Sequence, residues 1–493
     1  MLLGFRIKFA SLRQHMPTLK RLLDTVRIIT PRSQIRFASL SSSSSGEGHH
    51  NILILGGGIA GLSTARYLLR YTRHHRNNNT TVTLIDKNID LLEEINYDSS
   101  RCPLSYEERI SSGRPHKNIP SRRNGNYLCP SLIVPWTARP LWSEVILPLL
   151  KFGLGSGRGK NHRRPPITFD WPSLLADRNM WSFGIHFLLQ KFILGHPEHN
   201  TNKSILEYSM KCMNDPSDEL VQSIKYGRFA IGTKSNDGTV ANDCDSTGDI
   251  DLFCRGLLEK LLAEYKDDGR FIVISGEEVV KLQLDNGIIR GVSTIDHDGN
   301  RRVRNADMIV VAMGTNSTSL CQDIGVPCPV YPVKGHLVTV ASKFDHQYNL
   351  TLDGGIGYAA PLVDLDSQGR RLYRLSGFVD FTSTKTADSD RIDALLDATR
   401  SQLPDLEMID ASACHRPISA DDRALIGPVG TEYPNLYLIT GLGSRGWTIG
   451  LGSGKLLASQ MLNLPCDIDP TPYLPTRFNL LSRKKWGGKE ESL

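Results

Sequence analysis

Residues 52–86 constrain the fold of this chain more than any other segment. An apolar run over Ile52–Leu55 predicts a buried parallel strand. Three glycines follow at G-x-G-x-x-G spacing, namely Gly56, Gly58 and Gly61. Apolar residues at helical spacing come next, and a second apolar run, Val82–Ile85, ends at the acidic Asp86. The segment is therefore a complete βαβ unit, which predicts an α/β fold.

This βαβ unit predicts a binding site for an adenine dinucleotide. The glycines permit a tight turn and let the backbone approach a pyrophosphate, which the helix N-terminus around Ile59 and Ala60 faces. Asp86 can accept hydrogen bonds from a ribose. Because NAD and FAD share these contacts, the unit by itself leaves both cofactors open.

The first forty residues are strongly basic. Met1–Leu40 holds eight lysines or arginines and one acid, Asp24. This excess accounts for the formal net charge of +6, so the rest of the chain is near neutral and nucleic-acid binding is not expected. An arginine-rich, acid-poor segment is typical of a transit peptide, and Arg36–Ser39 resembles a mitochondrial processing site. We expect residues 1–50 to be a transit peptide and Ser-rich linker, and the protein to be mitochondrial. A plastid signal and a disordered basic tail are the alternatives.

The cysteines and the apolar runs exclude other classes. Nine cysteines contain no C-x-x-C pair, so neither a metal site nor a disulfide framework is expected. No run reaches the roughly 18 apolar residues of a membrane span. Residues Trp181–Leu194 predict an amphipathic helix. Packing inside the protein is favoured for it, and peripheral membrane contact is left open.

Later segments continue the nucleotide-binding pattern in pieces. A length of 493 residues favours two domains. Buried strands are predicted at 271–275, 306–314 and 435–440, alternating strands at 330–340 and 358–381, and a glycine-rich loop at Gly441–Gly454 before a helix at Lys455–Leu462. We expect a nucleotide-binding domain of residues 51–139, 236–327 and 405–465. A second domain of residues 140–235 and 328–404 is inserted, and 466–493 form a tail.

Six blocks in order resemble one family, the FAD-dependent amino-acid oxidoreductases of the D-amino-acid oxidase, glycine oxidase and sarcosine oxidase group. Within it, the sequence is most similar to the small subunit of bacterial D-amino-acid dehydrogenase. The blocks are the βαβ unit and residues 124–136, 245–253, 331–335, 416–427 and 440–454. The resemblance covers about Asn51 to Leu462, although the loop at 88–123 is longer than in the bacterial enzymes. It implies a discontinuous Rossmann-type FAD-binding domain with an inserted α+β substrate domain.

The resemblance makes FAD the expected cofactor. In this group a late glycine-rich turn and a helix N-terminus meet the flavin pyrimidine, where negative charge develops on reduction. Fifteen residues are implied to contact FAD: Gly56, Gly58, Ile59, Ala60, Gly61, Asp86, Asn124, Gly125, Val279, Gly314, Gly441, Gly443, Gly446, Trp447 and Thr448.

The resemblance also implies a substrate site. Arg416, in an Arg-Pro step, corresponds to an arginine that grips a substrate carboxylate, and a planar guanidinium suits a carboxylate through two parallel hydrogen bonds. The alternative is a structural arginine paired with Asp421 or Asp422. Tyr358 resembles a tyrosine that lines the same pocket, and its alternative is an aromatic residue on a sheet face.

The implied reaction is oxidation of the amine of a small, D-configured amino acid to an imine and then a 2-oxo acid. Hydride transfer to flavin needs alignment and no dedicated base, so His336 is expected to be structural. Cys414 lies near the position at which sarcosine oxidases attach flavin covalently, but non-covalent FAD is favoured. Oxidation of sarcosine or a secondary amine such as proline, and a non-catalytic assembly factor for a respiratory complex, are the alternative functions. Dioxygen, a quinone or a flavoprotein could accept the electrons.

Overall fold

The computed structural model describes most of the chain after residue 49. The described ranges are 50–74, 80–88, 125–131, 167–190, 199–227, 229–230, 232–234, 240–352 and 356–481. The expected transit peptide, Asn124 and nearly all of the loop at 88–123 lie outside these ranges. Within them, no helix has the length and apolar character needed to cross a bilayer.

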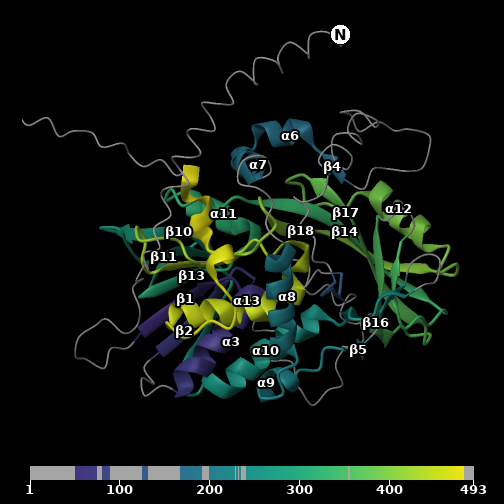
Figure 1. Cartoon of the computed structure of the whole chain (residues 1–493), viewed down its shortest axis with the longest axis horizontal. Coiled ribbons are helices and arrows are strands. Elements are labelled where there is room, and N and C mark those ends of the chain that lie inside the picture. Colours follow the sequence, from purple (N-terminus) through teal and green to yellow (C-terminus); the bar gives the residue numbers. More distant parts are fainter. Residues whose placement is uncertain are drawn as a thin grey trace, which may run out of the picture. The chain divides into compact units, whose positions relative to one another are not determined.

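A six-stranded sheet forms the nucleotide-binding domain (Figure 1). Its order is β19 (Leu425–Pro428), β20 (Leu436–Thr440), β13 (Met308–Val311), β1 (His50–Leu55), β2 (Thr80–Asp86) and β9 (Phe271–Ser275). All neighbours run parallel except β19 and β20. The central strands are apolar on both faces because both faces are covered, as in other parallel sheets.

Helices cover one face of this sheet and a small sheet covers the other. Side chains of β1 that point one way, such as Ile52 and Ile54, share a core with the three helices α3 (Ile59–His74), α10 (Ile250–Tyr265) and α13 (Gly446–Met461). Leu53 and Leu55 point the other way. They share a core with β10 (Glu277–Asp285), β11 (Ile288–Asp296) and α11 (Ser317–Gln322). The small sheet is antiparallel and has the order β10-β11-β12, in which β12 is Arg301–Asn305.

The second domain is built on an eight-stranded mixed sheet (Figure 1). Its order is β18 (Glu407–Ser419), β14 (Val330–Ser342), β17 (Arg371–Phe381), β16 (Gly357–Leu365), β15 (Asn349–Thr351), β6 (Thr233–Lys234) and β7 (Val240–Asn242), and β4 (Ile167–Phe169) also pairs with β17. Helix α12 (Ser389–Thr399) packs on one face through a core that includes Val338, Leu375 and Leu395. The opposite face carries the candidate substrate residues.

The remaining short elements join the two sheets. A three-stranded sheet has the order β3 (Tyr127–Leu128), β8 (Ser246–Thr247) and β5 (Phe229–Ala230). Between β3 and β5 the described residues form four helices, namely α6 (Trp171–Ala176), α7 (Arg178–Leu189), α8 (His199–Met213) and α9 (Glu219–Gln222). The predicted amphipathic helix is α7, which buries Phe183 and His186 and exposes Trp181, Ile185 and Leu188.

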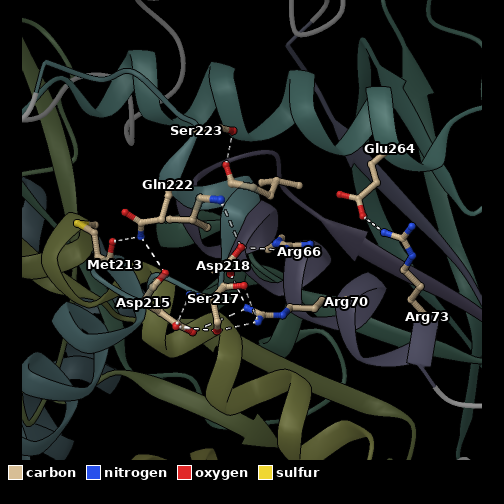
Figure 2. Close-up of polar contacts among 12 residues, drawn as sticks. Arg66, Arg70, Arg73, Met213, Asp215, Ser217, Asp218, Gln222, Ser223 and Glu264 are labelled. Carbon is tan, nitrogen blue, oxygen red and sulfur yellow. Dashed lines mark hydrogen bonds and ion pairs between the residues drawn. The ribbon is translucent and has the colours of Figure 1, made fainter.

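A buried ion-pair cluster holds α3 against the turn between α8 and α9 (Figure 2). Asp218 is fully buried and accepts from Arg66 at 2.7 Å and from Arg70 at 2.8 Å. The same carboxylate accepts from the backbone N–H of Val221 and so caps α9. A buried carboxylate is tolerated only when it is paired in this way. The cluster therefore locks the cofactor-side helix to its neighbours.

The predicted glycine-rich loop at Gly441–Gly454 is wrong for most of its length, because α13 begins at Gly446. Its glycines allow close contact between helices. A Cβ on Gly450 would lie 2.6 Å from the Ile59 side chain, and one on Gly454 would lie 2.5 Å from the backbone carbon of Ser63. Sequence reasoning took the run of glycines as a loop, whereas close packing against α3 is what requires them.

For two segments, the predicted domain differs from the sheet or core to which the segment belongs in the structure. The boundary at residue 405 puts β18 in the nucleotide-binding domain, but β18 pairs with β14 in the second sheet through Ser419. Helices α8 and α9 were assigned to the inserted domain, yet Leu206 and Val221 belong to the core under α3 and α13. A long-range strand pairing or a shared core leaves no local signal in the sequence. The rest of the domain division stays a prediction.

Candidate active site

The carboxyl ends of β1, β13 and β20 meet at one edge of the first sheet, where parallel sheets of this kind bind ligands. Gly56 turns away from β1 with φ of +114°, and its N–H donates to the Ile85 carbonyl at 2.8 Å. A Cβ on Gly56 would lie 2.5 Å from the Ala312 carbonyl oxygen, and one on Gly61 would lie 1.9 Å from the Gly56 oxygen. The tight turn predicted from the glycine spacing is therefore present, and no larger residue fits it.

Asp86 lies at the end of β2 beside this turn. Its Oδ2 accepts the N–H of Gly57 at 2.6 Å, and its Oδ1 accepts the N–H of Asn88 at 2.8 Å. These two bonds hold the carboxylate in place next to the N-terminus of α3, which has no acidic residue in its first turn. Asp86 is therefore positioned as the sequence predicts for a ribose-binding carboxylate, and the contact itself stays a prediction.

A second helix N-terminus, that of α13, starts after β20. Gly441 and Gly443 have φ of +69° and +62°, which lets the chain turn from the strand through a short 3-10 helix at Gly443–Arg445. No side chain caps α13, and no acid lies in its first turn. Its free N–H groups suit a group that becomes negative, as flavin does on reduction. Thr448 Oγ1 accepts the Cys129 N–H at 3.1 Å, so the segment after β3 lies against this helix end.

Three further predicted cofactor residues have clear positions. Gly314, with φ of +57°, follows β13, and its carbonyl accepts a 2.8 Å hydrogen bond from Thr440 Oγ1 at the end of β20. Trp447 is buried with its Nε1 unpaired among the described residues. Val279 lies in β10 opposite Thr294 and packs partly buried against the core of that face. Gly314 and Trp447 thus adjoin the carboxyl edge, while an adenine contact at Val279 stays a prediction.

The residues present fit FAD. Two long helices begin at one sheet edge, the glycine turn at Gly56 leaves room for a backbone approach, and Asp86 is held beside it. Trp447 supplies a buried donor without a described partner. No group of three or more potential metal ligands occurs in the described ranges.

Arg416 lies on the face of the second sheet that is opposite α12. Its guanidinium covers Gly335, where a Cβ would lie 2.2 Å from Cζ, and its Nη1 donates to the Phe378 carbonyl at 2.8 Å. No carboxylate of the described residues forms an ion pair with Arg416. Asp421 pairs instead with Arg423 and Arg477.

Asp422 pairs with Arg445 at 3.0 Å. The structural alternative for Arg416, a pair with Asp421 or Asp422, is therefore wrong. Among the described residues, no carboxylate pairs with Arg416, so its positive charge is available to the anion of a ligand.

Tyr358 adjoins Arg416 on the same face. It lies on β16 opposite Ser376 of β17, and its ring centroid is 4.5 Å from that of Tyr127. A Cβ on Gly125 would lie 2.2 Å from its hydroxyl oxygen. Burial raises the pKa of Tyr358, and the nearby charge of Arg416 opposes that rise. The structure thus places Tyr358 beside Arg416, as the resemblance implies, and adds Gly125, which was predicted as a cofactor residue.

Sequence reasoning missed two contributors to this face. Tyr127 donates to Asp245 Oδ2 at 2.5 Å, and Thr233 Oγ1 approaches the same oxygen at 2.9 Å, which fixes the ring beside Tyr358. The block beginning at Asp245 was recognised only as part of the resemblance. Phe378 is the other, and an ordinary phenylalanine in a strand pattern carries no sign that its carbonyl holds Arg416.

His336 and Cys414 differ in their surroundings. His336 is fully buried on the α12 side, and its Nε2 accepts the Asp388 N–H at 3.1 Å. Burial lowers the pKa of His336 to about 4. Its Nδ1 lies 3.6 Å from Asp380 Oδ2. His336 therefore lies on the face away from Arg416, and its structural role stays a prediction. Cys414 is partly exposed and lies opposite Gly335, two residues before Arg416. Covalent attachment of flavin to Cys414 stays untested.

Comparison with known proteins identifies the family. The sequence profile of the FAD dependent oxidoreductases (DAO) matches residues 239–460. An uncharacterized oxidoreductase of Halorhodospira halophila is 31% identical over 201 residues, which cover 38% of this chain and 84% of that protein. The chain belongs to the FAD-dependent oxidoreductase (DAO) family. Its cofactor is FAD, as in that family.

One further sequence and one crystal structure show what else the chain is similar to. A D-amino acid dehydrogenase of Vibrio vulnificus (strain YJ016) is 29% identical over 241 residues, which cover 47% of this chain and 52% of that enzyme. The chain thus spans about half the length of the curated dehydrogenases it matches. The crystal structure of L-proline dehydrogenase from P. horikoshii has a TM-score of 0.52 at 13% identity, covering 87% of this chain and 98% of that one. The α/β fold with a separate mixed sheet is confirmed.

Proposed function

We propose that this DAO-family protein oxidises the amine of a small amino acid, with a D-amino acid as the favoured substrate. The observation that carries the proposal is the guanidinium of Arg416. It is held by the Phe378 carbonyl on the sheet face beside Tyr358, and no carboxylate of the described residues neutralises it. The carboxylate of an amino acid suits such a guanidinium, because it can accept two parallel hydrogen bonds from it.

The chain's own residues would bind and align the substrate. Arg416 would donate two parallel hydrogen bonds to the substrate carboxylate, and the Tyr358 hydroxyl would donate to the same group. Because burial raises the pKa of Tyr358, its proton would remain in place at neutral pH. Bound FAD supplies the hydride acceptor. Anchoring the carboxylate fixes the direction of the Cα–H bond, so alignment and exclusion of water are the tasks left to the protein.

The D-amino acid preference is supported by the similarity to D-amino acid dehydrogenases over 241 residues. That similarity covers half of those enzymes, so oxidation of sarcosine or of a secondary amine such as proline is the rival activity to test. A non-catalytic assembly factor is disfavoured by the same Arg416 geometry. Such a protein has no use for a guanidinium aimed at a ligand carboxylate.

The proposal is tested by anaerobic reduction of the flavin. Purified holoprotein is mixed with D- and L-amino acids, glycine, sarcosine and proline, and loss of the flavin absorbance is followed. We expect small D-amino acids to bleach the flavin. Failure of every compound to do so would contradict an amino-acid oxidoreductase, and bleaching only by sarcosine or proline would select the rival activity.

A variant of Arg416 separates binding from structure. Arg416→Ala is expected to raise KM by about 100-fold or more, because the hydrogen bonds to a charged group are lost. The FAD content should be unchanged. Arg423→Ala is a matched control, since this arginine pairs with Asp421 rather than facing the site. Loss of FAD in Arg416→Ala with unchanged KM in the remaining holoprotein would make Arg416 structural.

Location and electron acceptor are part of the proposal. The basic, acid-poor segment at 1–40 supports import into mitochondria, and a fusion of residues 1–50 to a fluorescent protein tests it. Accumulation in plastids would overturn it. Reoxidation of the reduced holoprotein by air, a soluble quinone or an electron-transfer flavoprotein identifies the acceptor.

A further inference from the structure

We propose that Phe378 and Arg391 are positioning residues that set the orientation in which Arg416 meets a substrate carboxylate. The inference rests on the proposed function, because that function assigns the carboxylate to Arg416. Phe378 connects the two faces of the second sheet. Its ring belongs to the core between the sheet and α12, while its carbonyl oxygen accepts the 2.8 Å hydrogen bond from Arg416 on the opposite face.

A bulge between β14 and β17 turns this carbonyl toward Arg416. In this strand pair, Val333 lies opposite Phe381 and Lys334 opposite Asp380. The register then shifts, so that His336 lies opposite Gly377. Gly335 therefore faces two residues, Phe378 and Val379, that have no register partner in β14. This Gly335 is the residue that the Arg416 guanidinium covers. Bulges commonly re-aim a group next to an active site.

Phe378 adopts a conformation that does not suit its side chain. Its φ is +63°, in the left-handed region where glycine is the usual residue. A bulky residue persists there only when its surroundings hold it, and such outliers gather at functional sites. Glycine would provide the same backbone turn without strain. The presence of phenylalanine indicates that its ring does something that a glycine could not.

Arg391 of α12 holds that ring. Its Cζ lies 4.1 Å from the ring centroid of Phe378, and its Nη2 donates to Asp380 Oδ1 at 2.5 Å and to Thr168 Oγ1 at 3.0 Å. Arg391 is 2% exposed, so the stack and the ion pair are both shielded from water. His336 meets the same ring edge-on at 6.3 Å. The ring is therefore clamped from the α12 side, and the carbonyl that contacts Arg416 cannot rotate freely.

The clamp predicts a loss of carboxylate affinity when the ring is released. Phe378→Gly keeps the bulge and removes both the strain and the ring, while Arg391→Lys keeps a charge beside Asp380 and removes the planar stack. We expect each variant to raise KM for an amino-acid substrate about tenfold with a smaller change in kcat. Binding of propionate, an amine-free carboxylate, should weaken by a similar factor, measured by perturbation of the flavin absorbance. Phe378→Tyr should retain wild-type values.

Stability measurements separate positioning from general damage. Leu403→Ala is the control, because Leu403 is fully buried in the same core beyond the C-terminal end of α12. It should lower the urea midpoint and leave KM and propionate affinity unchanged. Phe378→Gly should retain FAD, and its midpoint should fall less than that of Leu403→Ala because the strained φ is relieved.

Two results would overturn the inference and leave the proposed role of Arg416 intact. One is wild-type KM and propionate affinity in both Phe378→Gly and Arg391→Lys, while Arg416→Ala loses propionate. The other is an equal rise of KM in Leu403→Ala, which would make the effect one of core stability. If Arg416→Ala itself leaves propionate affinity unchanged, the proposed role of Arg416 is wrong and this inference falls with it.

Discussion

Gly125 lies directly against the hydroxyl group of Tyr358: a Cβ on residue 125 would be 2.2 Å from Oη and 3.0 Å from the Cβ of Ser376. The glycine therefore lets the segment before β3 reach the substrate face of the second sheet. Tyr358 is also fixed from the side by the ring of Tyr127. The contact makes a cofactor-side segment part of the wall of the proposed substrate pocket.

Gly125→Ala should displace Tyr358 and lower kcat/KM about tenfold or more, because a Cβ at that distance forces the tyrosine to move. Steady-state kinetics check this, with the flavin spectrum confirming that FAD remains bound. The double variant with Tyr358→Phe lacks the closest contact atom. Its loss should therefore be smaller than the sum of the two single effects. Strict additivity of the two free energies would argue against the steric contact.

Tyr358→Phe should raise KM for the amino acid about tenfold with FAD retained, through loss of one hydrogen bond to a charged group. The pH dependence has a definite direction. Burial raises the pKa of Tyr358 from its ordinary value of 10, so the hydroxyl stays protonated up to at least that pH. The KM of the wild-type protein should then show no tyrosine ionisation below pH 10. A wild-type ionisation near pH 8 that disappears in Tyr358→Phe would contradict this assignment.

The buried carboxylate of Asp421 should stabilise the fold in a defined pH range. Burial alone would raise its pKa, but Arg477 and Arg423 lower the pKa of Asp421 from 3.8 to about 2. A depressed pKa in the folded state contributes stability that is present above about pH 4 and is lost as the pH falls toward 2. Asp421→Asn should lower the free energy of unfolding at pH 7 by about 3–5 kcal/mol, since Arg477 is left buried without a counter-charge.

Urea unfolding at pH values from 7 to 3 measures this effect. The difference between the wild-type protein and Asp421→Asn should narrow as the pH falls below about 4. Asp397→Asn is the control, because Asp397 pairs with Arg400 on the surface and both side chains are mostly exposed. Its effect should be below about 1 kcal/mol at any pH. A constant difference for Asp421→Asn across the range would show that its charge is not what matters.

Gly454→Ala should separate α13 from α3. A Cβ there would lie 2.5 Å from the backbone carbon of Ser63, and backbone atoms cannot yield as a flexible side chain can. We expect a loss of about 1–3 kcal/mol in the free energy of unfolding, with weaker FAD binding because the N-terminus of α3 shifts. Gly184→Ala is the matched control. This glycine in α7 has open space around it, so the substitution should be neutral or stabilise by up to about 1 kcal/mol.

Local patterns in the sequence predict the first sheet well because its strands and glycines are governed by nearby residues. β1, β2 and β9 begin and end close to their predicted positions, since an apolar run bounded by polar residues is sufficient to specify a buried strand. The run from Gly446 to Gly454 shows the limit. Glycine there is selected by the backbone of Ser63 and by Ser209, which are far away in sequence, so a local pattern cannot separate a loop from a tightly packed helix.

The candidate site also has features that the sequence predicts and features that only the tertiary structure shows. The sequence by itself determined the βαβ unit, because that unit depends on residue types at short, fixed spacing. The expectation of FAD and the choice of Arg416 came from the resemblance of six sequence blocks to one family. Only the tertiary structure decided which groups surround Arg416. The bulge that aims the Phe378 carbonyl, the approach of Gly125 to Tyr358 and the pairing of Asp421 away from the site all join residues from separate strands. These contacts depend on strand register and on which face of the sheet each side chain occupies, and both are set by long-range pairing.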